Sequence, residues 1–94
     1  MKKLAIVTGA NKGLGLSVAQ QLIHDNYKVI LACRDKTKGQ QAEKFLGENT
    51  KFMELDLSDP KSIDNFSHEI SQSYSGVNVL YNNAGLIYQD FNLT

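Results

Sequence analysis

The stretch Thr8-Gly9-Ala10-Asn11-Lys12-Gly13-Leu14-Gly15 decides the fold of this chain. It follows an apolar run at residues 4–7 that is typical of a buried strand, and apolar residues then recur at helical spacing over residues 14–25. Glycine permits a tight turn and a close approach to the backbone, while the first turn of a helix offers unpaired N–H donors. A strand, a glycine loop and a helix in this order predict a phosphate-binding site at the loop.

The spacing of the glycines excludes other patterns. A Walker loop would need glycine in place of Leu14, and the usual dinucleotide pattern GxGxxG would need it in place of Val18. Ser17 resembles the serine of a hydrolase nucleophile elbow, but that serine directly follows a strand. Because the strand here ends at Thr8, we expect Ser17 on the surface of the helix. The pattern that remains is TGxxxGxG.

The rest of the chain repeats the alternation of apolar runs and amphipathic stretches. We expect strands at residues 4–8, 28–33, 51–55 and 77–81, with helices at about 14–25, 37–46 and 60–70 between them. Strands joined by helices form a parallel sheet with right-handed crossovers. The sequence therefore predicts an α/β, Rossmann-type parallel sheet of order 3-2-1-4, flanked by helices and truncated after its fourth strand. Ligands of such sheets bind beyond the carboxyl ends of the strands, here between the first and the fourth.

The helix ends and apolar stripes add detail. Asn26 is expected as a left-handed cap of the first helix, Gly47 ends the second, and Asp59-Pro60 begins the third. The stripes that should face the sheet are Ala42, Phe45 and Leu46 in the second helix, and Ile63, Phe66 and Ile70 in the third.

Composition excludes several classes of function. The 10 Lys+Arg residues balance 10 Asp+Glu residues and are scattered, so nucleic-acid binding is not expected. No apolar run approaches the roughly 18 residues that span a bilayer, and the run after Lys2 and Lys3 is broken too soon for a signal peptide. A single Cys cannot form an internal disulfide, and no Cys/His cluster has metal-ligand spacing. We expect a cytoplasmic protein with no metal site and no membrane partner.

Two motifs at predicted strand ends carry a family resemblance. The chain resembles the N-terminal part of a short-chain dehydrogenase/reductase, whose TGxxxGxG and NNAG motifs are matched by Thr8, Gly9, Gly13 and Gly15, and by Asn82, Asn83, Ala84 and Gly85. It is most similar to the NADPH-dependent carbonyl reductases of that family, through Asn11-Lys12 and residues 32–40. The resemblance implies that residues 1–94 are an incomplete, N-terminal portion of one Rossmann-fold NAD(P)-binding domain.

The resemblance also implies which residues bind the cofactor. They are Gly9, Asn11, Lys12, Gly13, Leu14 and Gly15 in the loop, Arg34 after the second strand, Asp56 and Leu57 at the adenine ring, and Asn83, Ala84 and Gly85 after the fourth strand. One position departs from the pattern, because many family members have Asp where this chain has Asn78.

Residues 33–35 bear on the choice between NADPH and NADH. Family members that prefer NADH usually carry an acid where this chain has the neutral Cys33, and Arg34 offers a bidentate fork to the 2′-phosphate of NADPH. Lys12 would add a second cation. NADPH is therefore expected. In the alternative, Arg34 and Lys12 are solvated surface cations and Asp35 binds the ribose.

The family's catalytic residues have no counterpart in these 94 residues. The family transfers hydride with a Tyr-x-x-x-Lys pair, a Ser and a further Asn, the tyrosine acting as general acid and base. No tyrosine of this chain has lysine at the required spacing, and His24 and His68 are expected to be surface residues. The parent protein is expected to reduce small-molecule carbonyl compounds, and the 94 residues alone to be inactive.

Other functions and one physical liability follow from the sequence. The chain could be a non-catalytic nucleotide-binding or interaction module made as a short product. A methyltransferase with a related glycine loop is disfavoured by NNAG and by Arg34, where a ribose-binding acid would be expected. If the sheet ends at its fourth strand, Val77, Val79 and Tyr81 lie along an unpaired edge, which predicts self-association.

Overall fold

A computed structural model describes residues 2–9, 13–82 and 86–92 of the chain, the last of these by their backbone alone. The elements are β1 (Lys3–Thr8), α1 (Gly13–His24), β2 (Tyr27–Cys33), α2 (Lys36–Leu46), β3 (Thr50–Glu54), α3 (Pro60–Ser73), β4 (Gly76–Asn82) and β5 (Leu86–Asn92). Each helix and strand expected from the sequence is present, with ends that shift by a few residues.

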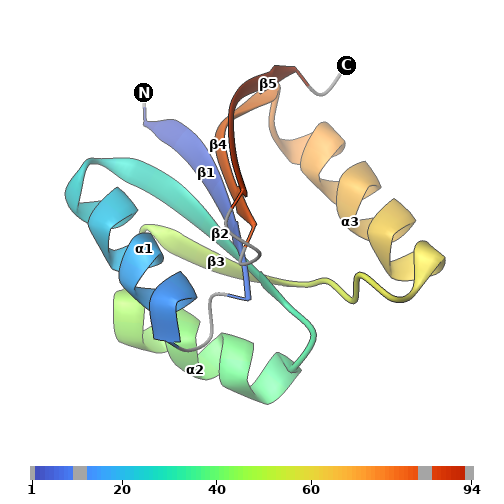
Figure 1. Cartoon of the computed structure of the whole chain (residues 1–94), viewed down its shortest axis with the longest axis horizontal. Coiled ribbons are helices and arrows are strands. Elements are labelled where there is room, and N and C mark those ends of the chain that lie inside the picture. Colours follow the sequence, from blue (N-terminus) through green and yellow to red (C-terminus); the bar gives the residue numbers. More distant parts are fainter. Residues whose placement is uncertain (1, 10–12, 83–85, 93–94) are drawn as a thin grey trace.

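The first four strands form the expected parallel sheet. They lie in the order β3-β2-β1-β4, and all three pairings are parallel. Figure 1 shows α1 and α2 against one face of the sheet and α3 against the other. The predicted order 3-2-1-4 and the predicted flanking helices are therefore confirmed.

The core has two halves because successive side chains of a strand point to opposite faces. Leu4 and Ile6 of β1 belong to the cluster that packs beneath α3. Ala5 and Val7 belong to the cluster beneath α1 and α2. The apolar runs that predicted β1 and β2 are thus continuous because both faces of these strands are buried.

The sheet does not end at its fourth strand. β5 pairs with β4 in antiparallel register from Gly76↔Asn92 to Asn82↔Leu86. The parallel part of the sheet ends at β4, as predicted, but the prediction of an unpaired β4 edge was wrong, because the edge of the sheet passes to β5. Outward N–H and C=O groups of a strand attract any extended segment that can reach them, and residues 86–92 follow β4 closely enough to do so. Their apolar residues do not alternate, so periodicity gave no sign of a strand.

The helix ends agree with the sequence analysis. Asn26 has a φ of 69° after α1, and Gly47 ends α2 with a φ of 96°. The Asp59 side chain accepts a hydrogen bond from Lys61 N at 3.0 Å, with Pro60 at the start of α3. Two stripe predictions were wrong, since Phe45 of α2 is 68% exposed and Ile63 of α3 is 38% exposed. α2 contacts the edge of the sheet through Ala42 and the half-buried Leu46, and its Phe45 faces away from them.

Asn78 joins β4 to the start of β1. Its side-chain Oδ1 accepts a hydrogen bond from Leu4 N at 2.9 Å. A carboxylate could accept the same bond, so the asparagine at this position keeps the contact that an aspartate would make.

Glu43 covers the outer edge of β3. Its Oε2 accepts a hydrogen bond from the backbone N–H of Phe52 at 2.7 Å. β3 is an edge strand, and an unpaired N–H there is both a polar group without a partner and a template for another chain. We expect Glu43→Ala to lower the free energy of unfolding by about 1.5 to 3 kcal/mol, the usual contribution of a hydrogen bond to a charged group. Urea unfolding checks this. Glu48→Ala, which removes an exposed carboxylate from the loop before β3, is the control, and an equal loss in both variants would contradict the role given to Glu43.

No helix among the described residues is long and apolar enough to cross a bilayer. In the same part of the chain, no group of three or more His, Cys, Asp or Glu side chains is placed to hold a metal ion.

Candidate functional site

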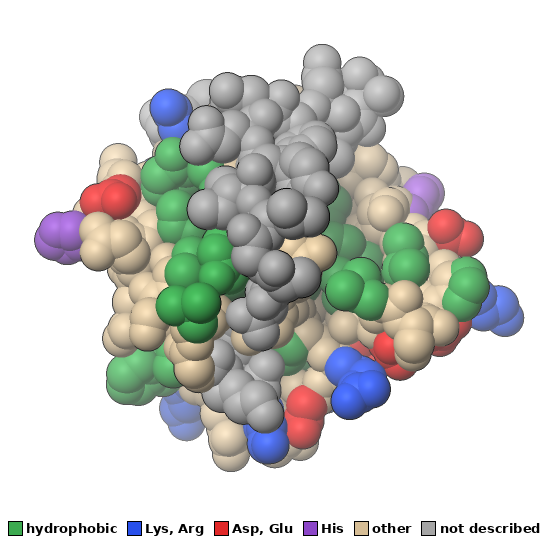
Figure 2. All heavy atoms as spheres, viewed as in Figure 1, with side chains coloured by type: hydrophobic (Ala, Val, Ile, Leu, Met, Phe, Trp, Pro, Cys, Tyr) green, Lys and Arg blue, Asp and Glu red, His purple; other side chains and the backbone are tan. Residues whose placement is uncertain are grey.

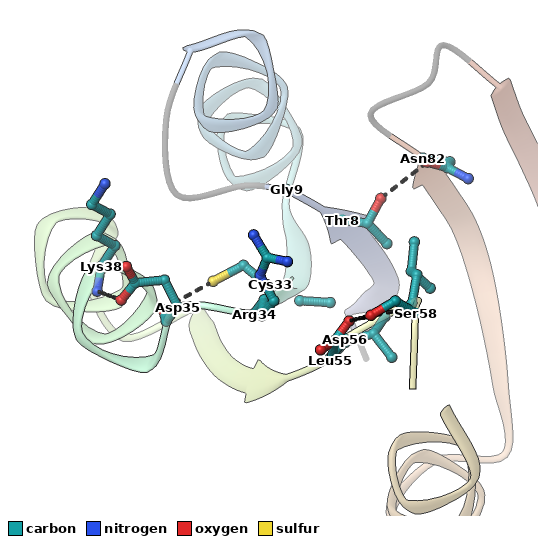
Figure 3. Close-up of a pocket in the computed structure, with 12 residues that line it drawn as sticks. Thr8, Gly9, Cys33, Arg34, Asp35, Lys38, Leu55, Asp56, Ser58 and Asn82 are labelled. Atoms are coloured by element: carbon teal, nitrogen blue, oxygen red, sulfur yellow. Dashed lines mark hydrogen bonds between the residues drawn. The ribbon is translucent and has the colours of Figure 1, made fainter. Parts of the chain in front are cut away.

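A cavity of about 490 Å³ lies at the carboxyl ends of the parallel strands. This volume is in the range of sites that hold small molecules and cofactors. Residues at the ends of β1, β2, β3 and β4 and just after them line it (Figure 3): Thr8, Gly9, Ala32, Cys33, Arg34, Asp35, Lys38, Leu55, Asp56, Leu57, Ser58 and Asn82. The cavity lies where the sequence analysis expected a ligand, beyond the strand ends beside the reversal of strand order.

The glycine loop begins at the wall of the cavity. Gly9 has a φ of 65°, and its N–H donates to Ala32 O at 2.8 Å, which fixes the start of the loop against β2. Gly13 has a φ of 59° at the first residue of α1. Both values lie in the left-handed region that a side chain disfavours, so glycine is needed at both positions. Asn11 and Lys12 lie outside the described residues.

The first turn of α1 stands behind the loop. Gly15 is buried against the sheet, whereas Leu14 is 64% exposed. Neither residue lines the cavity, and nor does Gly13. Ser17 lies on the exposed side of α1, as predicted, and its hydroxyl donates to Gly13 O at 3.4 Å.

A contact between β1 and β4 forms the opposite wall. Thr8 Oγ1 lies 3.4 Å from Asn82 Oδ1 and 3.5 Å from Tyr81 O. The contact between Thr8 and Asn82 joins the end of β1, just before the glycine loop, to the first residue of NNAG. Figure 3 shows these two side chains directed toward each other. The predicted site residues Asn83, Ala84 and Gly85 lie outside the described residues.

The junction between β2 and α2 forms the third wall. Asp35 is the N-cap of α2, and its Oδ1 accepts a hydrogen bond from Lys38 N at 3.0 Å. This contact gives the Asp35 carboxylate a structural role at the helix start. The Cys33 thiol lies 3.5 Å from Asp35 O and is 6% exposed. Burial raises the pKa of the Cys33 thiol, with smaller contributions from the carboxylates of Asp35 and Glu54, so the thiol is neutral at physiological pH.

Two cations stand at this junction, Arg34 and Lys38. Both line the cavity and both are exposed. Neither side chain forms an ion pair or hydrogen bond with another described residue. In Figure 3 both rise on the same side of the junction, and Figure 2 shows Lys and Arg side chains beside acidic ones along the lower edge of the molecule. The cavity thus has two positive groups at its rim and a neutral thiol in its wall.

Lys38 was missed as a site residue by the sequence analysis. The position of Asp35 could have indicated Lys38, because the third residue after an N-cap aspartate lies in the first turn of the helix. That turn begins beside the end of β2, so its side chains share the rim with Arg34.

Asp56, Leu57 and Ser58 form the last wall, after β3. Asp56 Oδ1 accepts hydrogen bonds from the Ser58 hydroxyl at 2.6 Å and from Ser58 N at 2.9 Å. These bonds, with a smaller contribution from the charge of Arg34, hold the pKa of the Asp56 carboxyl below its usual range. The helix-cap role that could have explained Asp56 belongs to Asp59. Leu57 is 60% exposed at the mouth of the cavity.

The lowered pKa of Asp56 predicts a pH dependence of stability. A carboxyl with a lowered folded-state pKa stabilises the fold above its unfolded pKa of about 3.9, and this contribution is lost as the pH falls through the folded pKa. We therefore expect Asp56→Asn to unfold at lower urea concentration than the wild type at neutral pH, with a gap that closes under acid conditions. Asp64→Asn, at an exposed carboxylate of α3, is the control. A gap for Asp56→Asn that is the same at all pH values would contradict the assignment.

Residues 3–93 match the family model described as short chain dehydrogenase. Carbonyl reductase (NADPH) 1 of Rattus norvegicus is 38% identical over 92 residues, which are 94% of this chain and 33% of that protein. Salutaridine reductase of Papaver somniferum is 37% identical over 90 residues, or 90% of this chain and 29% of the relative. The solved structure of menthone neomenthol reductase from Mentha piperita has a TM-score of 0.79 and 35% identity, covering 92% of this chain and 32% of its own. The chain therefore spans about a third of the length of these relatives.

Proposed function

The chain belongs to the short chain dehydrogenase family, and on that premise we propose that it is the NADPH-binding, N-terminal part of an oxidoreductase that reduces small-molecule carbonyl compounds. Its relatives include proteins whose names state carbonyl reduction with NADPH. We further propose that residues 1–94 are an incomplete portion of one NAD(P)-binding domain and that they do not transfer hydride by themselves.

The rim of the cavity carries the proposal. Arg34 and Lys38 are unpaired among the described residues, and both face the same cavity. An arginine fork and a lysine ammonium suit the 2′-phosphate that distinguishes NADPH from NADH. The neutral thiol of Cys33 adds no negative charge of its own that would repel a phosphate. Asp35, the rival ribose partner, already caps α2.

The wall after β3 fits the adenine end of the nucleotide. Both hydrogen bonds from Ser58 end on Oδ1 of Asp56, and none from a described residue ends on Oδ2. Because its pKa is lowered, this carboxylate is an acceptor at physiological pH and can bind an exocyclic amine. The exposed side chain of Leu57 offers an apolar surface for a flat ring. Gly9 and Gly13, with Asn11 and Lys12 between them, would hold the pyrophosphate at the start of α1.

The described residues have a limited part in the chemistry. NADPH, when bound, supplies the hydride. Arg34, Lys38, Asp56 and Leu57 would bind and orient its adenosine end, and the contact between Thr8 and Asn82 fixes the two strands beside which its other half would lie. The proton transfer belongs in this proposal to residues downstream of Thr94. We also propose a cytoplasmic setting, in which the single, buried Cys33 stays reduced.

One observation favours a second candidate, a nucleotide-binding module without catalysis. β5 covers the β4 edge that was expected to be open, so β4 has a strand partner on both sides within the chain. Such a module would bind NADPH tightly as an isolated chain. The same observation makes binding experiments on the 94-residue chain practicable.

Activity separates the two candidates. The coding sequence is extended past Thr94, and NADPH consumption with a water-soluble aromatic aldehyde is followed by absorbance. The proposal expects a downstream Tyr-x-x-x-Lys pair and aldehyde-dependent oxidation of NADPH by the longer protein, with none by the 94-residue chain. A stop codon after Thr94 together with tight NADPH binding would instead support the module.

A further inference from the structure

Gly39 lies where α2 touches β2 and β3. It is one of the buried residues of the helix. A Cβ at this position would overlap Cδ1 and Cε1 of Phe52 and would lie 2.8 Å from Sγ of Cys33. Cβ atoms do not approach other heavy atoms this closely, so the missing side chain is what allows α2 to begin so near the sheet.

Backbone conformation does not account for this glycine. Among the glycines that the structure describes, those with positive φ are Gly9, Gly13 and Gly47, and Gly39 is not one of them. A glycine inside a helix costs about 1 kcal/mol relative to alanine, so its presence near the start of α2 needs another reason. The close approach to the Phe52 ring and the Cys33 sulfur supplies one.

The same contact controls the cation-bearing end of α2. Gly39 N donates to Asp35 O at 2.8 Å, and Asp35 Oδ1 accepts from Lys38 N at 3.0 Å. The Cys33 thiol touches Asp35 O as well, at 3.5 Å. Asp35 and Lys38 lie at the start of α2, whereas Arg34 follows the end of β2 (Figure 3). A shift of α2 at Gly39 would therefore move Asp35 and Lys38 together and leave Arg34 with β2.

The position of Phe52 is fixed by a hydrogen bond of its backbone. Its backbone N–H is bound to Glu43 Oε2 at 2.7 Å, which joins β3 to the middle of α2. The ring is half-buried between the helix and the sheet. A methyl group on residue 39 would thus meet a ring whose backbone is tied to the same helix.

We propose that Gly39 is a positioning residue for the 2′-phosphate end of the nucleotide site, because its missing side chain seats the first turn of α2 against β2 and β3 and so sets the separation of Lys38 from Arg34. The inference rests on the proposed function. Gly39 touches no ligand in this account and acts only through the helix that carries Lys38.

The test uses two probes that differ only in the 2′-phosphate, 2′,5′-ADP and 5′-AMP, titrated calorimetrically into the 94-residue chain. Gly39→Ala should weaken the binding of 2′,5′-ADP by about tenfold, which is the contribution of one charge-assisted contact, and should change the affinity for 5′-AMP by less than about twofold. Gly39→Ala/Phe52→Ala removes the ring, which is the nearer of the two groups that the methyl group meets, and should recover most of the lost preference for 2′,5′-ADP over 5′-AMP. Phe52→Ala alone should keep the wild-type ratio of the two dissociation constants.

Gly47→Ala is the matched control at the other end of the same helix. A Cβ there would meet nothing within 4 Å, but the φ of 96° makes alanine strained, so this variant loses stability without moving the first turn of α2. It should keep the wild-type ratio.

If Gly39→Ala melts cooperatively and keeps the wild-type ratio of the two dissociation constants, the role of Gly39 is overturned but the proposed function is not. If Gly39→Ala does not fold, Gly39→Ala/Phe52→Ala is the deciding variant. A folded double variant with the wild-type ratio supports the inference. A double variant that has lost this ratio, while Phe52→Ala keeps it, overturns the inference. A wild-type ratio near one would overturn the proposed function, and this inference with it.

Discussion

Arg34→Asp should weaken the binding of 2′,5′-ADP to the chain by at least about tenfold, because it removes a charge-assisted contact and places a carboxylate beside the phosphate. Arg34 lines the cavity, and its guanidinium forms no ion pair or hydrogen bond with another described residue. Isothermal titration at an ionic strength of about 0.1 M measures the effect, since a high salt concentration would screen it. In the complete enzyme, the same change should raise the Michaelis constant for NADPH by a similar factor.

The control probe for Arg34→Asp is 5′-AMP, which lacks the 2′-phosphate and should bind almost as in the wild type. Lys44→Asp is the control variant, because it makes the same charge change on the exposed surface near the end of α2, away from the cavity. Equal losses for the two nucleotides in Arg34→Asp, or equal losses for 2′,5′-ADP in the two variants, would contradict a phosphate contact at Arg34.

Cys33→Asp should cause a comparable or larger loss, of roughly 30-fold for 2′,5′-ADP, because a carboxylate in the cavity wall faces a doubly charged phosphate at low effective dielectric. The thiol it replaces is neutral because burial raises its pKa. Binding of 5′-AMP should be retained, since a carboxylate at this place can accept hydrogen bonds from a ribose. Titration calorimetry near pH 8 keeps the new carboxylate ionised.

Cys33→Ser provides the matched control for this substitution, because it keeps the size and the neutral charge and adds a hydroxyl. We expect its affinities for both nucleotides to lie within about threefold of the wild type, a change in binding free energy smaller than the contribution of a typical hydrogen bond. A phosphate site beside Cys33 is contradicted if Cys33→Asp folds and still prefers 2′,5′-ADP, or if Cys33→Ser loses as much affinity as Cys33→Asp.

Local sequence was enough to predict the parallel part of the fold. β1 and β2 are buried on both faces, so each is a continuous apolar run. Asn26, Gly47 and Asp59-Pro60 marked helix ends because the caps themselves select these residue types. The site was predictable to the extent that it lies at strand ends, which is where Gly9, Arg34, Asp56 and Leu57 meet around one cavity.

Features that depend on contacts between distant segments were not predictable in the same way. β5 forms because the β4 edge offers unpaired backbone groups, and that attraction leaves no mark in the apolar period of residues 86–92. Phe45 has the hydrophobicity of a core residue, but the position of α2 beside the edge of the sheet leaves it exposed. Lys38 lies at the site because the N-cap at Asp35 places it in the first turn of α2. The role of Gly39 depends on how closely Phe52 and Cys33 approach it.

The central claim is that this chain holds a nucleotide site that recognises a 2′-phosphate. The most direct test is the ratio of the dissociation constants of 5′-AMP and 2′,5′-ADP for the wild-type chain, measured by titration calorimetry in one buffer. Two cations that pair with no other described residue lie at the rim, and a neutral thiol lies in the wall, so we predict that 2′,5′-ADP binds at least about tenfold more tightly than 5′-AMP. Equal affinity for the two nucleotides, or no binding of either, would contradict it.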